Sequence, residues 1–506
     1  MHHIESAIQT LFAASNETHK FPWTTKMPCL KLLGRYRTKY YPMMPVMKDE
    51  STTSNNIGIL EDLYCRQINV KSEGTPHHSE LRLIMGDLKT WRRIEAVKTL
   101  RAGISEDAFD QFRWLLPSIG LWHLRFNMLQ LLHAIHFSGK QPADPSDLQW
   151  AADRWRLSRV VQPNDFQALE DLIIHSYQAR VVGSWIRILR RQKTIGTVDR
   201  IEQLHPWLEA QQAGSSGSWM QTLERISDLL SAPHPTTPPQ ERLPVQDQEF
   251  QNHQNFCANV EVYLTLRYAI KHADIGLLRH ALRRVTMVFQ AEVAGTPNYS
   301  YALLRVLHMV DSPAASVELQ DSILANSLVN LRGGDNTNFE VDRLLELLNN
   351  NLKAFQKERS YFSPNSDRLL ESWSLNGPYL VNLKTMVERH LGHINSSEHP
   401  PKSAQENIWS MAITLAHKSL VDQALGARRY RFSMNPTVNL FTSGLEKLGD
   451  SVRRYNQRQD LSTAPISDPT VDPEVGVEIM VASDESPSSP TLPSTLFDTQ
   501  DAGFVE

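Results

Sequence analysis

The segment Leu81-Arg82-Leu83-Ile84-Met85-Gly86-Asp87 is the best strand candidate in the chain, a short apolar stretch that ends in glycine and aspartate. Its apolar and partly alternating residues are typical of a β-strand, and Gly86-Asp87 is a turn signal. A helical pattern begins at Thr90, so we expect a strand that leads into a helix. Open α/β sheets bind ligands at the carboxyl ends of their strands, which makes Asp87 a candidate site residue.

Helical periodicity dominates the chain beyond this segment. Apolar residues recur at i, i+3 and i+4 over residues 90–100, 121–137, 165–189, 219–230, 256–273, 275–293 and 340–356. More helices are expected between residues 405 and 455, and a second short strand at 327–331. No repeat with a period of about 20 to 50 residues is visible, which argues against a solenoid. The pattern predicts a mainly α protein with a small α/β core.

Composition and turn signals divide the chain into five regions. We predict an N-terminal segment (1–44), a partial α/β core (45–110), a helical region (111–324) with a proline-rich linker (231–246), a closing strand and helices (325–458), and a tail (459–506). The tail holds ten acidic residues and no lysine or arginine, and such a stretch is predicted to be disordered. The other 458 residues therefore carry a net charge of +6, which permits nucleic-acid binding.

The cellular compartment is predicted from cysteine usage and hydropathy. Cys29, Cys65 and Cys257 are few and far apart, which argues against a disulfide framework and favours a reducing compartment. No apolar run reaches the roughly 18 residues of a membrane span, and the first residues lack the pattern of a signal peptide. We expect a soluble intracellular protein that does not bind membranes. A nuclear location stays open, although no clear signal marks it.

Three carboxylates are candidates for catalysis. Asp87 would suit Mg²⁺ as an oxygen ligand at a strand end; the alternative is an N-cap that binds backbone N–H groups. Asp342 and Glu346 are four residues apart and so project from one helical face. A helix carboxylate that faces a strand-end carboxylate is the geometry of a two-metal nuclease. The alternative is a solvated acidic face paired with Arg343 and Lys353.

Histidines offer a weaker case for a metal site. His123, His133 and His136 lie on one apolar stretch and could share a metal only if that helix bends. No Cys-x-x-Cys pair supports zinc, so core or surface histidines are the favoured reading. The sequence also contains no P-loop, no dinucleotide-binding glycine pattern and no nucleophile elbow, which argues against nucleotide hydrolysis and serine-hydrolase chemistry.

Three basic groups could contact the phosphates of DNA, and tyrosines interleave with two of them and could stack on bases. The groups are Arg35, Arg37 and Lys39; Arg187, Arg190, Arg191 and Lys193; and Arg428, Arg429 and Arg431, with Tyr36, Tyr40 and Tyr430 among them. The alternative is that they are solvated helix ends. Protein partners are not indicated by any motif.

An ordered series of sequence blocks runs through the chain. The blocks are Met47-Lys48-Asp49-Glu50-Ser51, Gly86-Asp87-Leu88-Lys89-Thr90, the stretch 116–127, Ala273-Asp274-Ile275-Gly276, Pro297-Asn298-Tyr299-Ser300, Leu328-Val329-Asn330 and Asp342-x-x-x-Glu346-x-x-Asn349-x-x-x-Lys353. Taken together and in this order, they resemble domain of unknown function 6589, an uncharacterised fungal family. The resemblance spans about residues 45–391.

The resemblance implies a relation to transposases, because the family pattern is similar to a ribonuclease-H-like core interrupted by a large helical insertion. By that analogy Gly86-Asp87 ends the strand with the second catalytic acid, and residues 90–324 form the insertion. Glu346, or Asp342 beside it, would be the last acid on the closing helix. Mg²⁺ or Mn²⁺ would then bind at Asp87 and Glu346.

The chain departs from this pattern at the first acid. The family usually has an Asp-Asn motif upstream of Gly-Asp, whereas the only Asp-Asn here is Asp335-Asn336. We therefore expect a truncated core, and loss of one ligand generally loses the metal. Two functions remain: a catalytically incomplete, transposase-like protein that binds DNA, with residual metal at Asp87, Asp342 and Glu346, or a helical interaction scaffold or relic without chemistry.

Overall fold

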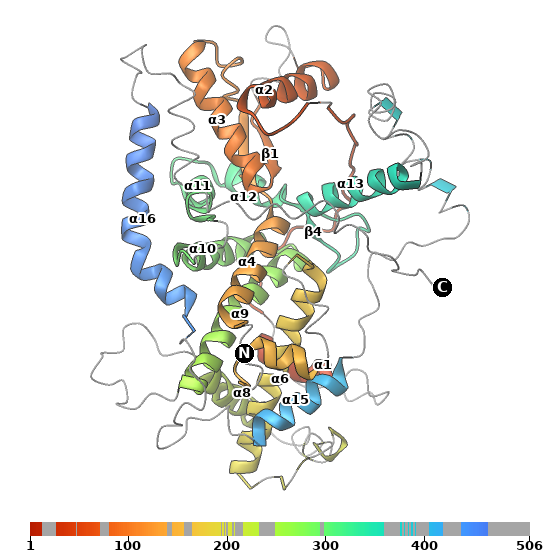
Figure 1. The fold of residues 1–506 in the computed structure, drawn as a ribbon, viewed down its shortest axis with the longest axis vertical. Helices are drawn as coiled ribbons and strands as arrows, with labels where there is room; N and C mark the ends of the chain where they lie inside the picture. Colours follow the sequence, from red (N-terminus) through yellow and green to blue (C-terminus); the bar gives the residue numbers. More distant parts are fainter. Residues whose placement is uncertain are drawn as a thin grey trace.

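The computed structural model of the chain describes residues 1–12, 27–46, 48–70, 80–138, 144–155, 164–193, 195–196, 198, 201–204, 207, 216–231, 248–293, 298–358, 404–417 and 437–463, with scattered positions between 375 and 390. These residues are mostly helical (Figure 1), which confirms the predicted fold class at that level. The residues Arg428, Arg429 and Arg431 lie outside the described part. So do 232–246 of the predicted linker and 464–506 of the predicted tail.

The helices of the described residues include all seven segments predicted from apolar periodicity, as well as helices at residues 2–12, 148–154, 300–311 and 317–325 that were not predicted. They are α1 (His2–Phe12), α2 (Thr53–Glu61), the π-helix η1 (Asp62–Gln67), α3 (Leu88–Ile104), α4 (Leu121–His136), α5 (Leu148–Arg154), α6 (Phe166–Arg191), the 3₁₀ helix η3 (Ile201–Leu204), α8 (Ser216–Leu230), α9 (Gln248–His272), α10 (Ile275–Gln290), α11 (Ser300–Asp311), α12 (Val317–Ala325), α13 (Val341–Glu358), α15 (Gln405–His417) and α16 (Leu440–Thr463). No described helix is long and apolar enough to cross a membrane.

Two parallel strands form the small α/β unit. The predicted strand is present as β1 (Arg82–Gly86), and it pairs with β2 (Leu115–Ile119) so that Gly86 lies beside Ile119. Strand β2 was not predicted. Pro117 has no backbone N–H to donate to a neighbouring strand, so the stretch 115–119 has a low strand propensity. Each strand leads directly into a helix, β1 into α3 and β2 into α4. The carboxyl ends of both strands therefore meet at one edge.

A second strand pair closes the unit from the C-terminal side of the sequence. The expected strand at 327–331 is present as β3 (Leu328–Val329), and it pairs antiparallel with β4 (Phe339–Glu340). Because α13 begins directly after β4, this short ribbon fixes where the first turn of α13 lies.

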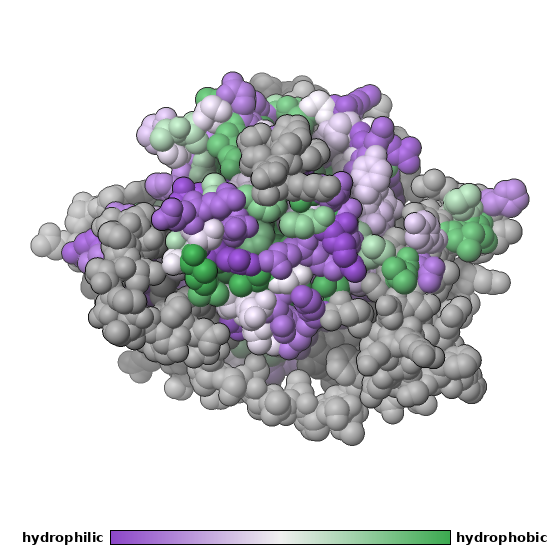
Figure 2. Space-filling view, turned by 90° about the horizontal axis from the view of Figure 1, so that it is seen from above, coloured by the Kyte–Doolittle hydropathy of each residue, from purple (hydrophilic) through white to green (hydrophobic). Residues whose placement is uncertain are grey.

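One large apolar core runs through most of the molecule. It contains Ile4 and Ile8 of α1, Trp91 of α3, the fully buried Trp185 of α6 and, much later in the chain, Leu440 of α16. All four predicted regions before the tail thus contribute to the same core. Figure 2 looks onto the end of the molecule that carries α2 and α3; there the described apolar residues form small groups among polar ones.

Candidate functional site

Asp87 occupies the N-cap of α3, at the carboxyl end of β1. Its carboxylate accepts a hydrogen bond from the backbone N–H of Thr90 at 2.7 Å. This is the N-cap role that the sequence offered as the alternative to metal binding. The cap satisfies one of the backbone donors that every helix start leaves without an intrahelical partner.

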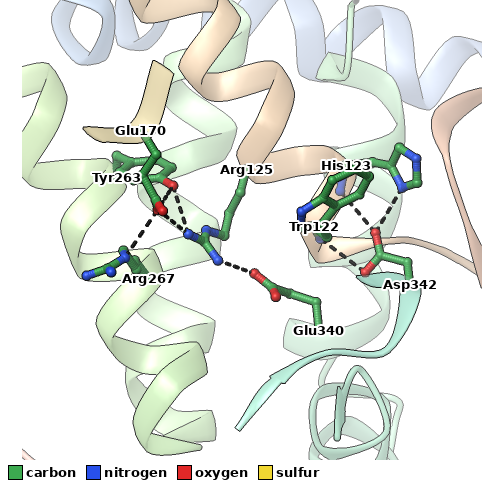
Figure 3. Close-up of polar contacts among 8 residues, drawn as sticks. All are labelled: Trp122, His123, Arg125, Glu170, Tyr263, Arg267, Glu340 and Asp342. Atoms are coloured by element: carbon green, nitrogen blue, oxygen red, sulfur yellow. Dashed lines mark hydrogen bonds and ion pairs between the residues drawn. The ribbon is translucent and has the colours of Figure 1, made fainter. Parts of the chain in front are cut away.

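Asp342, from the first turn of α13, caps the neighbouring helix α4. Its Oδ1 accepts from the N–H of Trp122 at 3.1 Å, and its Oδ2 accepts from the N–H of His123 at 3.0 Å. The Nδ1 of His123 lies 3.0 Å from the same Oδ2 (Figure 3). The cap residue of α4 itself is Gly120, where a Cβ atom would come within 2.2 Å of Oδ2. Glycine at 120 is therefore what lets a carboxylate from elsewhere reach the helix start.

Glu346 lies one turn further along α13 and faces the other nitrogen of the same imidazole. The Nε2 of His123 is 3.9 Å from Oε1 of Glu346. Burial lowers the pKa of His123, but the hydrogen bond to Asp342 and the charges of Asp342, Asp87 and Glu346 outweigh it, so the pKa is raised. The structure thus gathers all three predicted acids around His123.

Tyr299 lies behind this cluster and was not a candidate in the sequence. Its hydroxyl accepts from Nδ2 of Asn127 at 3.2 Å, and the side chain is buried. Burial raises the pKa of Tyr299, and the charges of Asp87 and Asp342 raise it further. The phenol therefore stays protonated, and Tyr299 places an uncharged side chain beside the carboxylates.

A buried ionic network next to this cluster joins α4 to β4, α6 and α9. Both Arg125 and Glu340 are buried, and the guanidinium of Arg125 pairs with Glu340 of β4 and with Glu170 of α6 (Figure 3). It also donates to the hydroxyl of Tyr263 at 2.8 Å, and Arg267 lies 3.2 Å from Glu170. Sequence reasoning missed these residues, because their partners are far away along the chain.

Two neighbouring contacts join α4 to the junction of β4 and α13. On α4, His123 contacts Asp342 and Arg125 contacts Glu340. In each segment the two residues are two positions apart, and the two contacts run in opposite chain directions. The position of Asp342 is therefore fixed both by its own hydrogen bonds and by the buried pair beside it.

The other candidate histidines do not join the cluster. His136 is buried and accepts from Nδ2 of Asn259 at 3.1 Å; burial, with a smaller effect of Arg180, lowers its pKa to about 3. His133 stacks on Phe137 with ring centroids 4.4 Å apart, and burial lowers its pKa. Both fit the favoured reading of core and surface histidines. Among the described residues, no three or more His, Cys, Asp or Glu side chains are placed to hold a metal ion.

The basic group at the end of α6 is partly tied to the body. Arg190 donates to the carbonyl of Val198 at 3.3 Å and lies against His417 of α15. Arg187 is half-buried, whereas Arg191 and Lys193 are exposed at the helix end.

The fold and the site define a mainly helical protein built on a parallel strand–helix unit, with Asp87 at the end of β1 and Asp342 of α13 at the start of α4. Over residues 2–399 the chain matches the family described as a family of unknown function, DUF6589, and it belongs to that family. The match confirms the resemblance and extends it from 45–391 to include α1. No curated protein and no solved structure is similar enough to the chain to count as a match.

The substitution Arg125→Met should destabilise the fold strongly, because it leaves the buried carboxylate of Glu340 without its counter-charge and leaves Glu170 with only the partly exposed Arg267. We expect the free energy of unfolding to fall by about 3–5 kcal/mol in urea denaturation followed by circular dichroism. Arg267→Met is the matched control, since Arg267 touches the same Glu170 but its side chain is 42% exposed. Equal losses in the two variants would contradict a central role for Arg125.

The His123–Asp342 contact should make stability depend on pH. Since the folded state raises the pKa of His123 above its ordinary value of about 6.5, the imidazolium contribution is complete below that pH. It is lost as the pH rises through the folded-state pKa. We expect the difference in unfolding free energy between the wild type and His123→Asn to be largest below about pH 6.5 and to shrink as the pH rises above it. A difference that stays constant as the pH rises would mean that His123 is not charged in the fold.

Proposed function

We propose that this chain derives from a fungal transposase with a ribonuclease-H-like core and now binds nucleic acid without cutting it. A nuclear location would follow from that function. Membership of the family and the gathering of Asp87, Asp342 and Glu346 at the strand ends support the ancestry. The hydrogen bonds that the Asp342 carboxylate already accepts support the loss of nuclease activity.

The observation that carries the proposal is that both oxygens of Asp342 are already bound. They accept two backbone N–H groups of α4 and the imidazole of His123 inside a buried site. A two-metal mechanism needs carboxylate oxygens that are available to bridge cations and to stabilise the reacting phosphate. Asp342 cannot cap the start of α4 and also bind a metal ion without loss of the fold.

The site as a whole does not fit the two-metal arrangement. One oxygen of Asp87 caps α3, and the imidazole of His123, whose pKa the carboxylates raise, lies between Asp342 and Glu346. We therefore do not expect Mg²⁺ or Mn²⁺ to bind at Asp87 and Glu346, where the resemblance implies a metal site.

The nucleic-acid part of the proposal is supported by the charge at the end of α6. The sequence contains no acidic residue between Asp171 and Asp199, whereas Arg187, Arg190, Arg191 and Lys193 lie in this interval. Arg191 and Lys193 are exposed, so phosphates can reach them. The alternative is a helical interaction scaffold, in which the same side chains are only a solvated helix end.

Calorimetric titration with Mn²⁺, beside a nuclease assay on short duplexes, tests the loss of chemistry. We expect no binding heat and no cleavage by the wild type or by Asp87→Ala, because the carboxylates are held by the fold. Micromolar binding that disappears in Asp87→Ala would overturn the proposal and show that a working carboxylate site survives.

Fluorescence anisotropy with labelled DNA tests binding. We expect the full chain to bind, with affinity that falls steeply as salt rises from about 50 to about 200 mM, since phosphate contacts release counterions. The double variant Arg191→Glu/Lys193→Glu should bind about tenfold more weakly. The control is Arg453→Glu on α16, where the side chain is 76% exposed but pairs with Asp450. No binding by the wild type would favour the scaffold.

A further inference from the structure

Residues 27–46 form an extended segment fixed along the surface, called the strap below. In Figure 1 it is the red-brown trace between the level of β4 and α2. Its backbone binds the body at several places. The N–H of Leu33 donates to the carbonyl of Ala273 at 2.9 Å, that of Thr38 to the carbonyl of Asn330 at 2.8 Å, and that of Met44 to Oε1 of Gln67 at 2.9 Å. The strap therefore follows one course over the helices.

Buried groups hold this course. The carboxylate of Asp274 is buried and accepts from the N–H groups of Leu30 and Lys31, each at 2.9 Å. Next to it, a Cβ atom at Gly276 would come within 2.7 Å of Leu30 and 2.9 Å of the nitrogen of Lys31, so the strap lies directly on the start of α10. These contacts use backbone atoms of the strap, and the side chains of Arg35, Arg37 and Lys39 remain exposed.

The fold adds two cations to those of the strap. The Nε of Arg37 donates to the carbonyl of Leu331 at 3.0 Å, which places Arg332 beside Arg37. Ala273, which binds Leu33, follows α9 two residues after Lys271. We call the exposed residues Arg35, Arg37, Lys39, Arg332 and Lys271, together with Tyr40 and Tyr41, the strap surface.

The charges of the strap surface are only weakly compensated. Arg35 pairs with Asp335, but the two side chains are 76% and 59% exposed, and such a pair contributes at most about 1 kcal/mol. In the part of the chain that the structure describes, Lys39, Arg332 and Lys271 form no ion pair. A phosphate could therefore exchange for Asp335 or bind the other cations directly.

Aromatic rings follow the cations along the same track. The side chains of Tyr40 and Tyr41 are 37% and 81% exposed. Exposed rings beside a line of cations suit unpaired bases, because stacking needs a free base face, which a duplex hides inside its stack. Seven residues of extended chain, 35–41, span roughly 20 Å, which is room for several nucleotides.

We propose that the strap surface binds a single strand of nucleic acid, with phosphates on its cations and bases on Tyr40 and Tyr41. This inference rests on the proposed function and assigns to it a second contact surface, apart from the end of α6. The bound nucleic acid would run toward the cluster of Asp87, Asp342 and Glu346. The chain beyond the strap reaches Glu50, which lies 3.7 Å from Lys89 at the start of α3.

The test uses the full chain and labelled single strands of deoxythymidine and of uridine, with a duplex of equal length as the third probe. We expect the single strands to bind more tightly than the duplex. Lys39→Glu/Arg332→Glu should weaken single-strand binding about tenfold or more, with a smaller dependence on salt, because phosphate contacts are lost. Tyr41→Ala should weaken it about fivefold or more at unchanged salt dependence, because a stacking contact is lost. Circular dichroism checks the fold, which these exposed side chains do not hold.

The outcomes separate this inference from the proposed function. If the wild type binds nucleic acid and Arg191→Glu/Lys193→Glu weakens binding while the strap variants do not, the strap surface is overturned and the proposed function stands. Tighter binding of the duplex than of the single strands would also overturn the strap inference. If the wild type binds none of the probes, both fail. Tighter binding of uridine than of deoxythymidine supports the inference and identifies the strand as RNA.

Discussion

The capping of α4 by Asp342 is the contact on which the rest of the site depends. A helix start has backbone N–H groups without partners, and Gly120 at the cap of α4 has no side chain to supply one. The carboxylate that fills this place comes from α13, so a single buried group joins the parallel strand pair to the closing helix. Hydrogen bonds to a charged acceptor contribute about 1.5–3 kcal/mol each, which makes this junction expensive to open.

The Arg125–Glu340 pair extends the junction into the helical region. Its guanidinium reaches Glu170 on α6 and Tyr263 on α9, so the helices between the two strand pairs are held to the same point as the strand ends. A buried arginine with two carboxylates is tolerated because each charge has a partner of opposite sign. The helical region is thus part of the support of the site rather than a separate attachment.

Local patterns in the sequence predicted the elements, and long-range contacts decided the site. Periodicity placed β1 and seven of the helices, and the N-cap role of Asp87 was already one of the two interpretations of that residue. Strand β2 was missed because Pro117 lowers its propensity while its pairing with β1 overrides that signal. The spacing of Asp342 and Glu346 put both on one face, and both do face His123. Nothing local could show that Gly120 makes room for Asp342, since that contact joins distant parts of the chain.

The blocks by which the sequence resembles its family coincide with positions that hold the chain together. Gly86-Asp87 ends a strand and caps a helix, Asp274 and Gly276 seat the strap, and Asp342 closes the junction at α4. Each of these roles requires the same residue types that a metal-dependent site would require, a carboxylate or a glycine at an element end. A motif of this kind therefore cannot distinguish catalysis from architecture by itself. The distinction lies in whether the carboxylate oxygens are available, and at Asp342 the backbone and an imidazole already bind them.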